Sequence, residues 1–191
     1  MVSRRGFLAG AAALGFAPLA FADDKSTWEK LRAGGIVLLM RHASTAEGLG
    51  DPPDFKLGDC STQRNLSEQG RDEARRVGER FRAEHIRVTK VFTSPWCRCR
   101  ETAMLAFGSA EDWTPLSSVF DFPHQEPEFT ERVKKRIGTY AAKKPAGVVV
   151  MVTHNVNIAA LSRYSVAPAE LVLMRPDGCC SARPLERLKV A

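Results

Sequence analysis

The sequence contains little of what marks metalloproteins and nucleic-acid-binding proteins. Four histidines and five cysteines occur among 191 residues, and none has the ligand spacing of a zinc motif, since Cys97 and Cys99 stand too close together. Lysine and arginine exceed aspartate and glutamate by six, but the two signs are mixed, as in RDEARRVGERFRAEH (71–85). Nucleic-acid binding would need a segregated basic patch with interleaved aromatic residues. We therefore expect no nucleic-acid partner and instead a small anionic substrate.

The chain also lacks an apolar run of the roughly 20 residues that a comfortable membrane span needs. Its start combines Arg4 and Arg5, a mild alanine-rich apolar stretch, and a small-x-small end at Ala20-Phe21-Ala22. This is the pattern of a bacterial twin-arginine export signal, although a short membrane anchor or a frayed N-terminal helix would be apolar too. We expect the twin-arginine export machinery to carry the chain and cleavage to follow near Ala22. Residues 23–191 would then be one periplasmic or secreted domain with no permanent membrane span.

The cysteine count is odd, so at least one thiol has no partner within the chain. The five are Cys60, Cys97, Cys99, Cys179 and Cys180. An oxidising compartment permits disulfides, and a structural disulfide such as Cys60–Cys97 is a better interpretation than a metal site. The sequence alone does not determine the pairing.

Apolar runs rich in β-branched residues alternate with helical patterns along the chain. The predicted strands are 36–40, 88–93, 147–153 and 171–174. The first and third lack polar alternation, as strands buried on both faces of a parallel sheet do. Ser67 is the predicted N-cap of a first helix, and its apolar face comprises Gly70, Ala74, Val77 and Phe81. Further helices are expected over 98–108, within 127–144 and from residue 155, so the sequence predicts one layered α/β domain.

Polar side chains follow three of these strands at the point where each strand ends. Arg41 and His42 follow the first strand. Ser94 follows the second, with Arg98 soon after, and His154 follows the third. Ligands of open α/β sheets bind beyond the carboxyl ends of the strands. We therefore expect two arginines and two histidines at one edge of the sheet.

This set of side chains suits phosphoryl chemistry. Guanidinium groups donate paired hydrogen bonds to phosphate oxygens and keep their charge at ordinary pH, which favours Arg41 and Arg98 as phosphate ligands. A neutral imidazole can attack phosphorus and form a covalent intermediate, and His42 leaves a rigid strand beside Arg41. His154 would stabilise charge in the transition state. The Thr45 hydroxyl and the amide at Asn155 are further expected phosphate ligands.

The segments LLMRHAST, TSPWCRCRETA and VVVMVTHN together resemble the three signatures of the histidine phosphatase superfamily, the phosphoglycerate-mutase-like or RHG family. NLSEQGRDEA, between the first two, resembles the helix start of the same family. The resemblance implies a three-layer α/β/α sandwich with a mostly parallel central sheet and catalysis without a metal or other cofactor. It also implies that His42 is the phosphorylated nucleophile, that Arg41 and Arg98 bind phosphate, and that His154 is the second catalytic histidine.

The proton donor does not stand out in the sequence. The third residue of the RHG triplet is Ala43, a small replacement, but Asn155 occupies the position where acid-phosphatase-like members have an aspartate. Asp121, Glu126 and Glu128 follow the helix that bears the second arginine. We choose Asp121, because the apolar segment SSVF precedes it and should place it near the sheet edge. Burial there would raise the pKa of its carboxyl, so that it could act as a general acid.

The predicted function is an exported phosphatase that hydrolyses a small phosphorylated substrate through a phosphohistidine on His42. Two alternatives use the same residues. One is a phosphomutase, which would need a phosphorylated sugar-acid substrate. The other is a non-catalytic phospho-ligand-binding protein that has lost its proton donor. The sequence does not specify the natural substrate or the oligomeric state.

Overall fold

The computed structural model describes residues 24–190 except 121, 144 and 179–180. The predicted export signal, residues 1–22, lies outside the described residues, as do Asp121, Cys179 and Cys180. Within the described part of the chain, no helix combines the length and the apolar character needed to cross a membrane.

A six-stranded mixed sheet forms the centre of the molecule, in the order β3-β2-β4-β1-β5-β6. The strands are β1 (Val37–Arg41), β2 (Val88–Thr93), β3 (Glu111–Asp112), β4 (Val148–Thr153), β5 (Leu171–Pro176) and β6 (Ala182–Leu188). Strand β4 pairs in parallel with β1 and β2, and β2 pairs in parallel with β3, whereas β5 runs antiparallel to β1 and β6. The predicted α/β class and mostly parallel sheet are confirmed.

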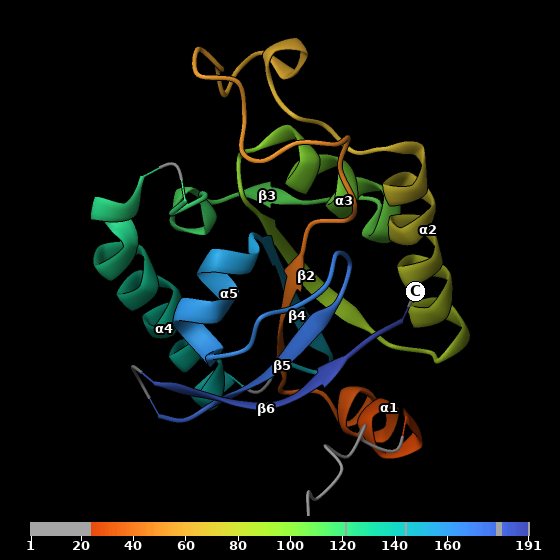
Figure 1. Ribbon diagram of the computed structural model, residues 1–191. Coiled ribbons are helices and arrows are strands. Elements are labelled where there is room, and N and C mark those ends of the chain that lie inside the picture. Colours follow the sequence, from red (N-terminus) through yellow and green to blue (C-terminus); the bar gives the residue numbers. More distant parts are fainter. Residues whose placement is uncertain (1–23, 121, 144, 179–180, 191) are drawn as a thin grey trace, which may run out of the picture.

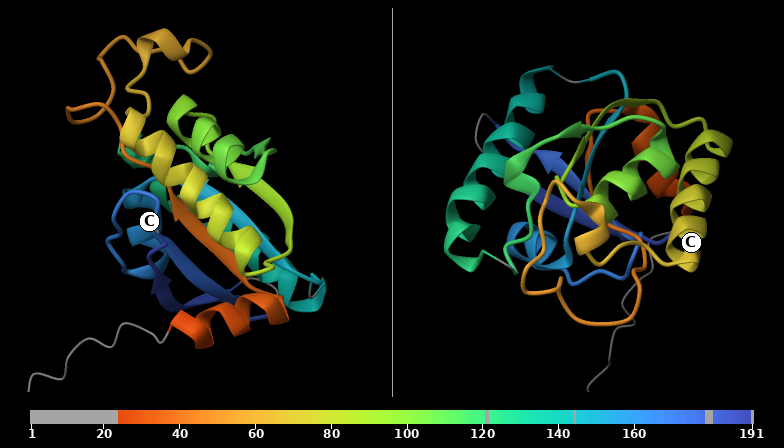
Figure 2. Two further views of the ribbon diagram at one scale, coloured as in Figure 1. Left: turned by 90° about the vertical axis from the view of Figure 1, so that its right-hand side faces the viewer. Right: turned by 90° about the horizontal axis from the view of Figure 1, so that it is seen from above.

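Helices cover both faces of the sheet, as Figure 1 shows. They are α1 (Asp24–Ala33), α2 (Glu68–Ala83), α3 (Cys97–Phe107), α4 (Glu126–Lys143) and α5 (Asn155–Ser162). One apolar cluster joins α1, α2 and α3 to one face of the sheet, through residues such as Leu38 and Val150. A second cluster joins α4 and α5 to the other face, through residues such as Leu39 and Met151. Successive strand residues point to opposite faces, so these runs of apolar residues form the middle of three layers (Figure 2).

Helix α2 begins where the sequence predicts it. The Ser67 hydroxyl accepts a hydrogen bond from the backbone N–H of Gly70 at 3.1 Å, which caps the first turn. A Cβ atom on Gly70 would lie 1.9 Å from the carbonyl oxygen of Ser44. Only glycine therefore allows α2 to pack this closely against the backbone of Ser44, which stands two residues after His42.

A disulfide joins Cys60 to Cys97, so the structure supplies the pairing that the sequence leaves open. Cys60 belongs to the long connection between β1 and α2, here called the β1–α2 loop (residues 42–67), and Cys97 is the first residue of α3. The loop rises above the end of the sheet in Figure 1, and the disulfide attaches it to the residue beside Arg98. Cys99 is a buried free thiol, and burial raises its pKa to about 12, so it is protonated.

Candidate active site

A small cavity lies at the carboxyl ends of β1 and β4 and beside the start of α3. Its volume is about 90 Å³, and its lining is Arg41, His42, Leu49, Gly50, Arg64, Arg98, Ser118, Phe120, His154, Asn155 and Val156. The parallel register of β1 and β4 pairs Arg41 with Thr153, so the residues that follow the two strands meet at one edge. The structure thus brings together the two arginines and two histidines that the sequence predicts there.

His42 is buried and neutral. Burial, followed by the charges of Arg98, Arg41 and Arg64, lowers its pKa to about 3, although a hydrogen bond to the carbonyl oxygen of Ala43 acts the other way. Nδ1 lies 2.8 Å from this oxygen, which can only accept, so Nδ1 carries the proton and donates. Nε2 therefore keeps its lone pair. This is the tautomer that a nucleophilic imidazole requires.

His154 faces His42 from the end of β4, with the two ring centroids 5.4 Å apart. Its Nε2 lies 2.9 Å from the hydroxyl oxygen of Ser94, which follows β2. Burial, followed by the neighbouring His42 and the arginines, lowers the pKa of His154 well below its ordinary value. Both imidazoles are therefore neutral at pH 7, and positive charge in the site comes from guanidinium groups.

Among the described residues, Arg41 and Arg98 each have a buried Nε–H group without a hydrogen-bond partner. Arg41 donates from Nη1 to the carbonyl oxygen of Val166 at 2.7 Å, and Arg98, only 3 % exposed, is held by an aspartate. An unsatisfied buried donor is costly, and an anion bound at the site could satisfy such donors.

The carboxylate that holds Arg98 is Asp51, a residue that the sequence analysis missed. It accepts from Nη1 of Arg98 at 2.8 Å, from Nε1 of Trp96 at 3.0 Å and from the backbone N–H of Arg64 at 2.8 Å. Burial favours the neutral acid, but these hydrogen bonds and the Arg98 charge outweigh it and hold the pKa of Asp51 below its ordinary value. Asp51 is thus an ionised carboxylate that fixes Arg98 and is poorly suited to donate a proton.

The other predicted site residues lie in different surroundings. Asn155 lines the cavity, while its side-chain oxygen accepts from the backbone N–H of Val166 at 2.8 Å. Thr45 forms an isolated bridge with Leu66 and does not line the cavity. Asp121, the chosen proton donor, lies outside the described residues.

The two alternative acids stand in the first turn of α4. Glu126 accepts from the Thr130 hydroxyl, and Glu128 pairs with Arg132. Neither lines the cavity, and no Asp or Glu is found among its described lining residues.

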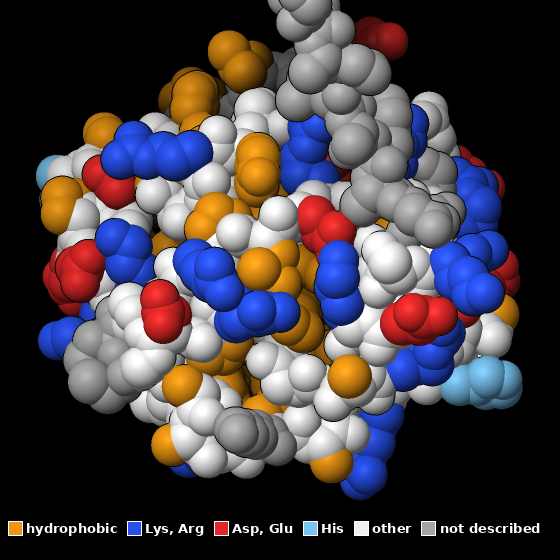
Figure 3. Space-filling model, turned by 90° about the horizontal axis from the view of Figure 1, so that it is seen from below, with side chains coloured by type: hydrophobic (Ala, Val, Ile, Leu, Met, Phe, Trp, Pro, Cys, Tyr) orange, Lys and Arg blue, Asp and Glu red, His pale blue; other side chains and the backbone are white. Residues whose placement is uncertain are grey.

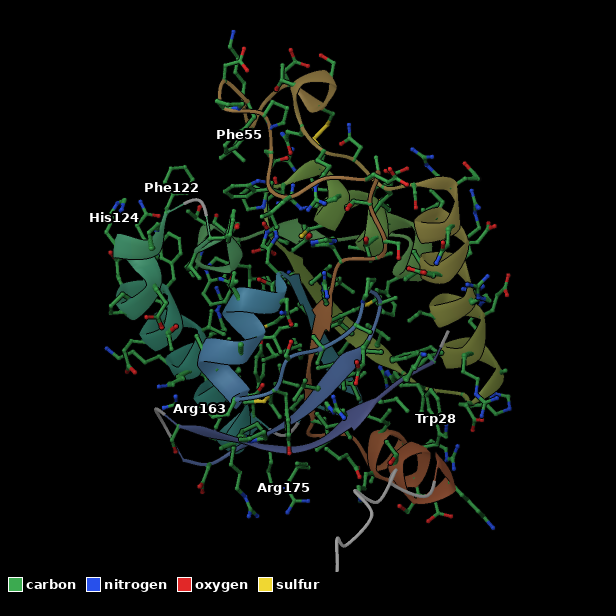
Figure 4. All side chains as sticks on the ribbon, in the orientation of Figure 1. Trp28, Phe55, Phe122, His124, Arg163 and Arg175 are labelled. Carbon is green, nitrogen blue, oxygen red and sulfur yellow. A yellow bond between two sulfur atoms is a disulfide. The ribbon has the colours of Figure 1, made fainter. Side chains whose placement is uncertain are left out.

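A larger hollow of about 480 Å³ lies at the opposite end of the sheet. It is formed by residues around Gly34, Tyr140, Pro145 and Arg175, and Figure 4 labels Arg175 at this lower end. Seen from below, this side of the molecule shows hydrophobic side chains between lysines and arginines (Figure 3). The hollow has no histidine in its lining. Within the described residues, no three His, Cys, Asp or Glu side chains are grouped so that they could hold a metal ion.

Comparisons with known proteins agree with this fold. Residues 37–118 match the histidine phosphatase superfamily (branch 1). No curated protein matches the chain.

Solved structures share the fold at low sequence identity. The protein histidine phosphatase SixA, complexed with tungstate, is 16 % identical with a TM-score of 0.53, over 81 % of this chain and 96 % of that one. Phosphoserine phosphatase from Entamoeba histolytica, in complex with 3-phosphoglyceric acid, is 10 % identical with a TM-score of 0.57, over 81 % and 96 %. A mycobacterial glucosyl-3-phosphoglycerate phosphatase is 16 % identical with a TM-score of 0.50, over 74 % and 90 %.

The three-layer α/β/α fold is of the histidine phosphatase and phosphoglycerate-mutase-like type. The matched segment includes Arg41, His42 and Arg98. The family match over residues 37–118 agrees with the resemblance of the motifs to the histidine phosphatase superfamily.

Proposed function

We propose that the protein hydrolyses a phosphomonoester through a phosphohistidine intermediate on His42. The observation that carries the proposal is the tautomer of His42: its Nδ1 donates to Ala43, so its Nε2 lone pair is available in the cavity that it shares with Arg41 and Arg98. Arg41 and Arg98 would bind the phosphoryl oxygens and neutralise the charge that spreads over them in the transition state.

The reaction would proceed in two displacements. Nε2 of His42 attacks phosphorus, the bond from phosphorus to the ester oxygen breaks, and the leaving oxygen takes up a proton. Water then attacks the phosphohistidine, the P–N bond breaks, and inorganic phosphate leaves while His42 regains its lone pair. His154 would stabilise the charged oxygens from the opposite side. Asp121 is our proposed proton donor, because Asp51 is held ionised and neither Glu126 nor Glu128 lines the cavity.

Replacement of the nucleophile tests this proposal. His42→Ala should lower the turnover of an aryl phosphate by a factor of roughly 10⁴ or more, because the covalent route is lost. The control is His124→Ala, which removes an exposed histidine away from the cavity and should keep full turnover. Undiminished phosphate release by the His42→Ala protein would contradict the proposed nucleophile.

A second candidate is a phospho-ligand-binding protein without turnover. The lack of an acidic side chain among the described cavity residues favours it. Release of phosphate by the purified protein would exclude this candidate. Phosphoryl exchange between substrate and product would instead indicate a phosphomutase.

We also propose that the protein is exported to the periplasm or secreted. The arginine pair and apolar stretch of residues 1–22 support this, and the Cys60–Cys97 disulfide is of a kind that persists in oxidising compartments. Cell fractionation of the wild type and of an Arg4→Lys, Arg5→Lys variant tests it. The wild type should be found outside the cytoplasm and the variant inside it.

A further inference from the structure

Two large apolar side chains are exposed at the mouth of the cavity. Among the described residues, the exposed large hydrophobic side chains are Leu49, Leu57, Met104 and Phe120. Leu49 is 87 % exposed and Phe120 is 53 % exposed, and both line the cavity. Scattered apolar side chains are ordinary on protein surfaces, but a group of them beside a cavity is typical of a binding surface.

The two side chains come from distant segments that meet at this point. Phe120 Cε1 lies 3.3 Å from the position that a Cβ on Gly50 would occupy. Gly50 follows Leu49 directly and has a φ of +71°, so its conformation and its lack of a side chain allow the close approach. Leu49 and Phe120 therefore form one apolar rim, here called the Leu49–Phe120 rim.

The backbone on both sides of the rim is held in place. Asp51 fixes the segment after Leu49, through its bonds to Arg98 and Trp96. On the other side, Asn157 accepts from the N–H of Val119 at 3.3 Å and donates to the carbonyl oxygen of Ser117 at 2.8 Å.

Further aromatic side chains lie in the same two segments of the chain as the rim residues. Phe55 and Phe122 pack against Trp96 with ring centroids 5.8 and 6.2 Å away, and Figure 4 labels both at this upper end of the molecule. The apolar surface at the mouth is thus built on a supported framework.

The cavity beside the rim is small, and its lining combines apolar residues with three arginines. Its volume is about 90 Å³, and Leu49 and Phe120 line it together with the phosphate-binding candidates Arg41 and Arg98. When the arginines and His42 hold the phosphoryl group of a phosphomonoester, the rest of the ester is adjacent to Leu49 and Phe120. A polar leaving group would lose hydrogen bonds to water there, whereas an apolar one would gain by burial.

We propose that the natural substrate is a phosphomonoester with an apolar leaving group, an alkyl or aryl phosphate, and that the Leu49–Phe120 rim binds this group. The proposal rests on the proposed phosphatase function of the site beneath the rim. The arginines select the phosphate and the rim selects what the phosphate is attached to.

A series of straight-chain alkyl phosphates tests the proposal, because ethyl, butyl and hexyl phosphate differ in apolar length but hardly in the chemistry of the leaving alcohol. The kcat/KM of the wild type should rise with chain length by up to about fourfold for each CH₂ that the rim covers. Propyl phosphate should be preferred to glycerol phosphate. A kcat/KM independent of chain length would overturn the proposal, as would a preference for phosphopeptides over every alkyl phosphate.

Variants of the rim show whether these side chains are responsible. Leu49→Ser and Phe120→Ser should each flatten the dependence of kcat/KM on chain length. Met104→Ser is the matched control, because Met104 is 52 % exposed but lies on α3 and does not line the cavity. Leu57→Ser controls for changes within the β1–α2 loop. Equal flattening in the control variants would contradict a specific role of the rim.

A binding experiment separates this inference from the proposed function. If the wild type releases phosphate from no ester, the phosphatase proposal fails, and calorimetry with methylphosphonate and hexylphosphonate still decides the role of the rim. Tighter binding of hexylphosphonate that Leu49→Ser and Phe120→Ser abolish would support the rim as a binding surface. Equal affinity for the two phosphonates would overturn it.

Discussion

Arg98 depends on a carboxylate that is far away in the sequence. Asp51 stands 47 positions earlier in the chain, in a proline-containing loop whose path sequence patterns do not predict. The side chains of the pair are only 4 % and 0 % exposed. A buried charge left without its partner is strongly destabilising. Asp51 therefore influences both the stability of the fold and the orientation of a proposed phosphate ligand.

Helix α3 contributes an arginine to one buried and to one exposed ion pair. Removal of the carboxylate partner should cost much more stability for the buried pair than for the exposed one. Asp51→Ala should lower the free energy of unfolding by about 3–5 kcal/mol and raise the KM for a phosphomonoester. Asp112→Ala is the control, because the Arg100–Asp112 pair is nearly half exposed and should contribute less than about 1 kcal/mol. Urea denaturation and steady-state kinetics measure both effects. Equal losses in the two variants would contradict the assigned role.

At the scale of single residues, the sequence predicts the site residues that belong to a recognisable motif. Arg41, His42, Arg98 and His154 follow apolar strands or belong to recognisable motifs, and the structure brings them together. Asp51 has no such signal, because its partners are set by the folding of the loop over the sheet. The same reason explains why Phe120 could not be assigned to the cavity from the sequence.

At the scale of secondary-structure elements, the buried strands and most of the helices packed on them are predictable from the sequence. The predicted strand over 88–93 matches β2, and the helix from Ser67 begins as expected. Strand β6 was missed, because its sequence ARPLERL has only one fully buried residue, Leu188. Its position at the edge of the sheet, paired antiparallel with β5, is a tertiary effect. Helix α1 was missed as well, although Trp28 and Leu31 anchor it to the core.

The disulfide is the element-scale feature with the clearest energetic consequence. It closes a segment of 37 residues, and its loss should lower the free energy of unfolding by about 3–4 kcal/mol in the chain-entropy description. A Cys60→Ser, Cys97→Ser variant should show this loss in urea denaturation. Its kcat/KM should also fall, because the loop that carries Asp51 is no longer covalently attached to α3.

Treatment with dithiothreitol provides the control for this experiment. The reductant should destabilise the wild type to the level of the double variant and leave the variant unchanged. The Cys99 thiol is buried and protonated and should contribute nothing to the difference. A wild type that keeps its stability and activity when fully reduced would contradict the prediction.

At the scale of the whole molecule, two buried neutral histidines make stability depend on pH. Burial is the main cause that lowers the pKa of His42 to about 3 and that of His154 well below its ordinary value, whereas both are near 6.5 in an unfolded chain. Between these values the unfolded chain binds protons that the folded chain does not. The free energy of unfolding should therefore fall with pH below about 6.5, by roughly 1.4 kcal/mol per pH unit for each histidine.

Denaturation of His42→Asn at pH 7 and pH 5 measures one of these contributions. The loss of stability between the two pH values should be about 2 kcal/mol smaller in this variant than in the wild type. His124→Asn, at an exposed position, should retain the full loss. If His42→Asn and the wild type lose the same amount, His42 is not buried as a neutral base.

Trp96 gives the molecule an internal optical signal. Its ring lies 5.4 Å from that of His154, and its Nε1 donates to Asp51. The chain has three tryptophans, and the other two pack elsewhere, Trp28 against Phe81 and Trp113 against Phe92; Figure 4 labels Trp28 at the far lower end. With these two replaced by phenylalanine, the remaining indole fluorescence comes from Trp96 alone, which contacts His154 and Asp51. Titration with vanadate or a phosphonate can then be followed by emission, without a label and without turnover.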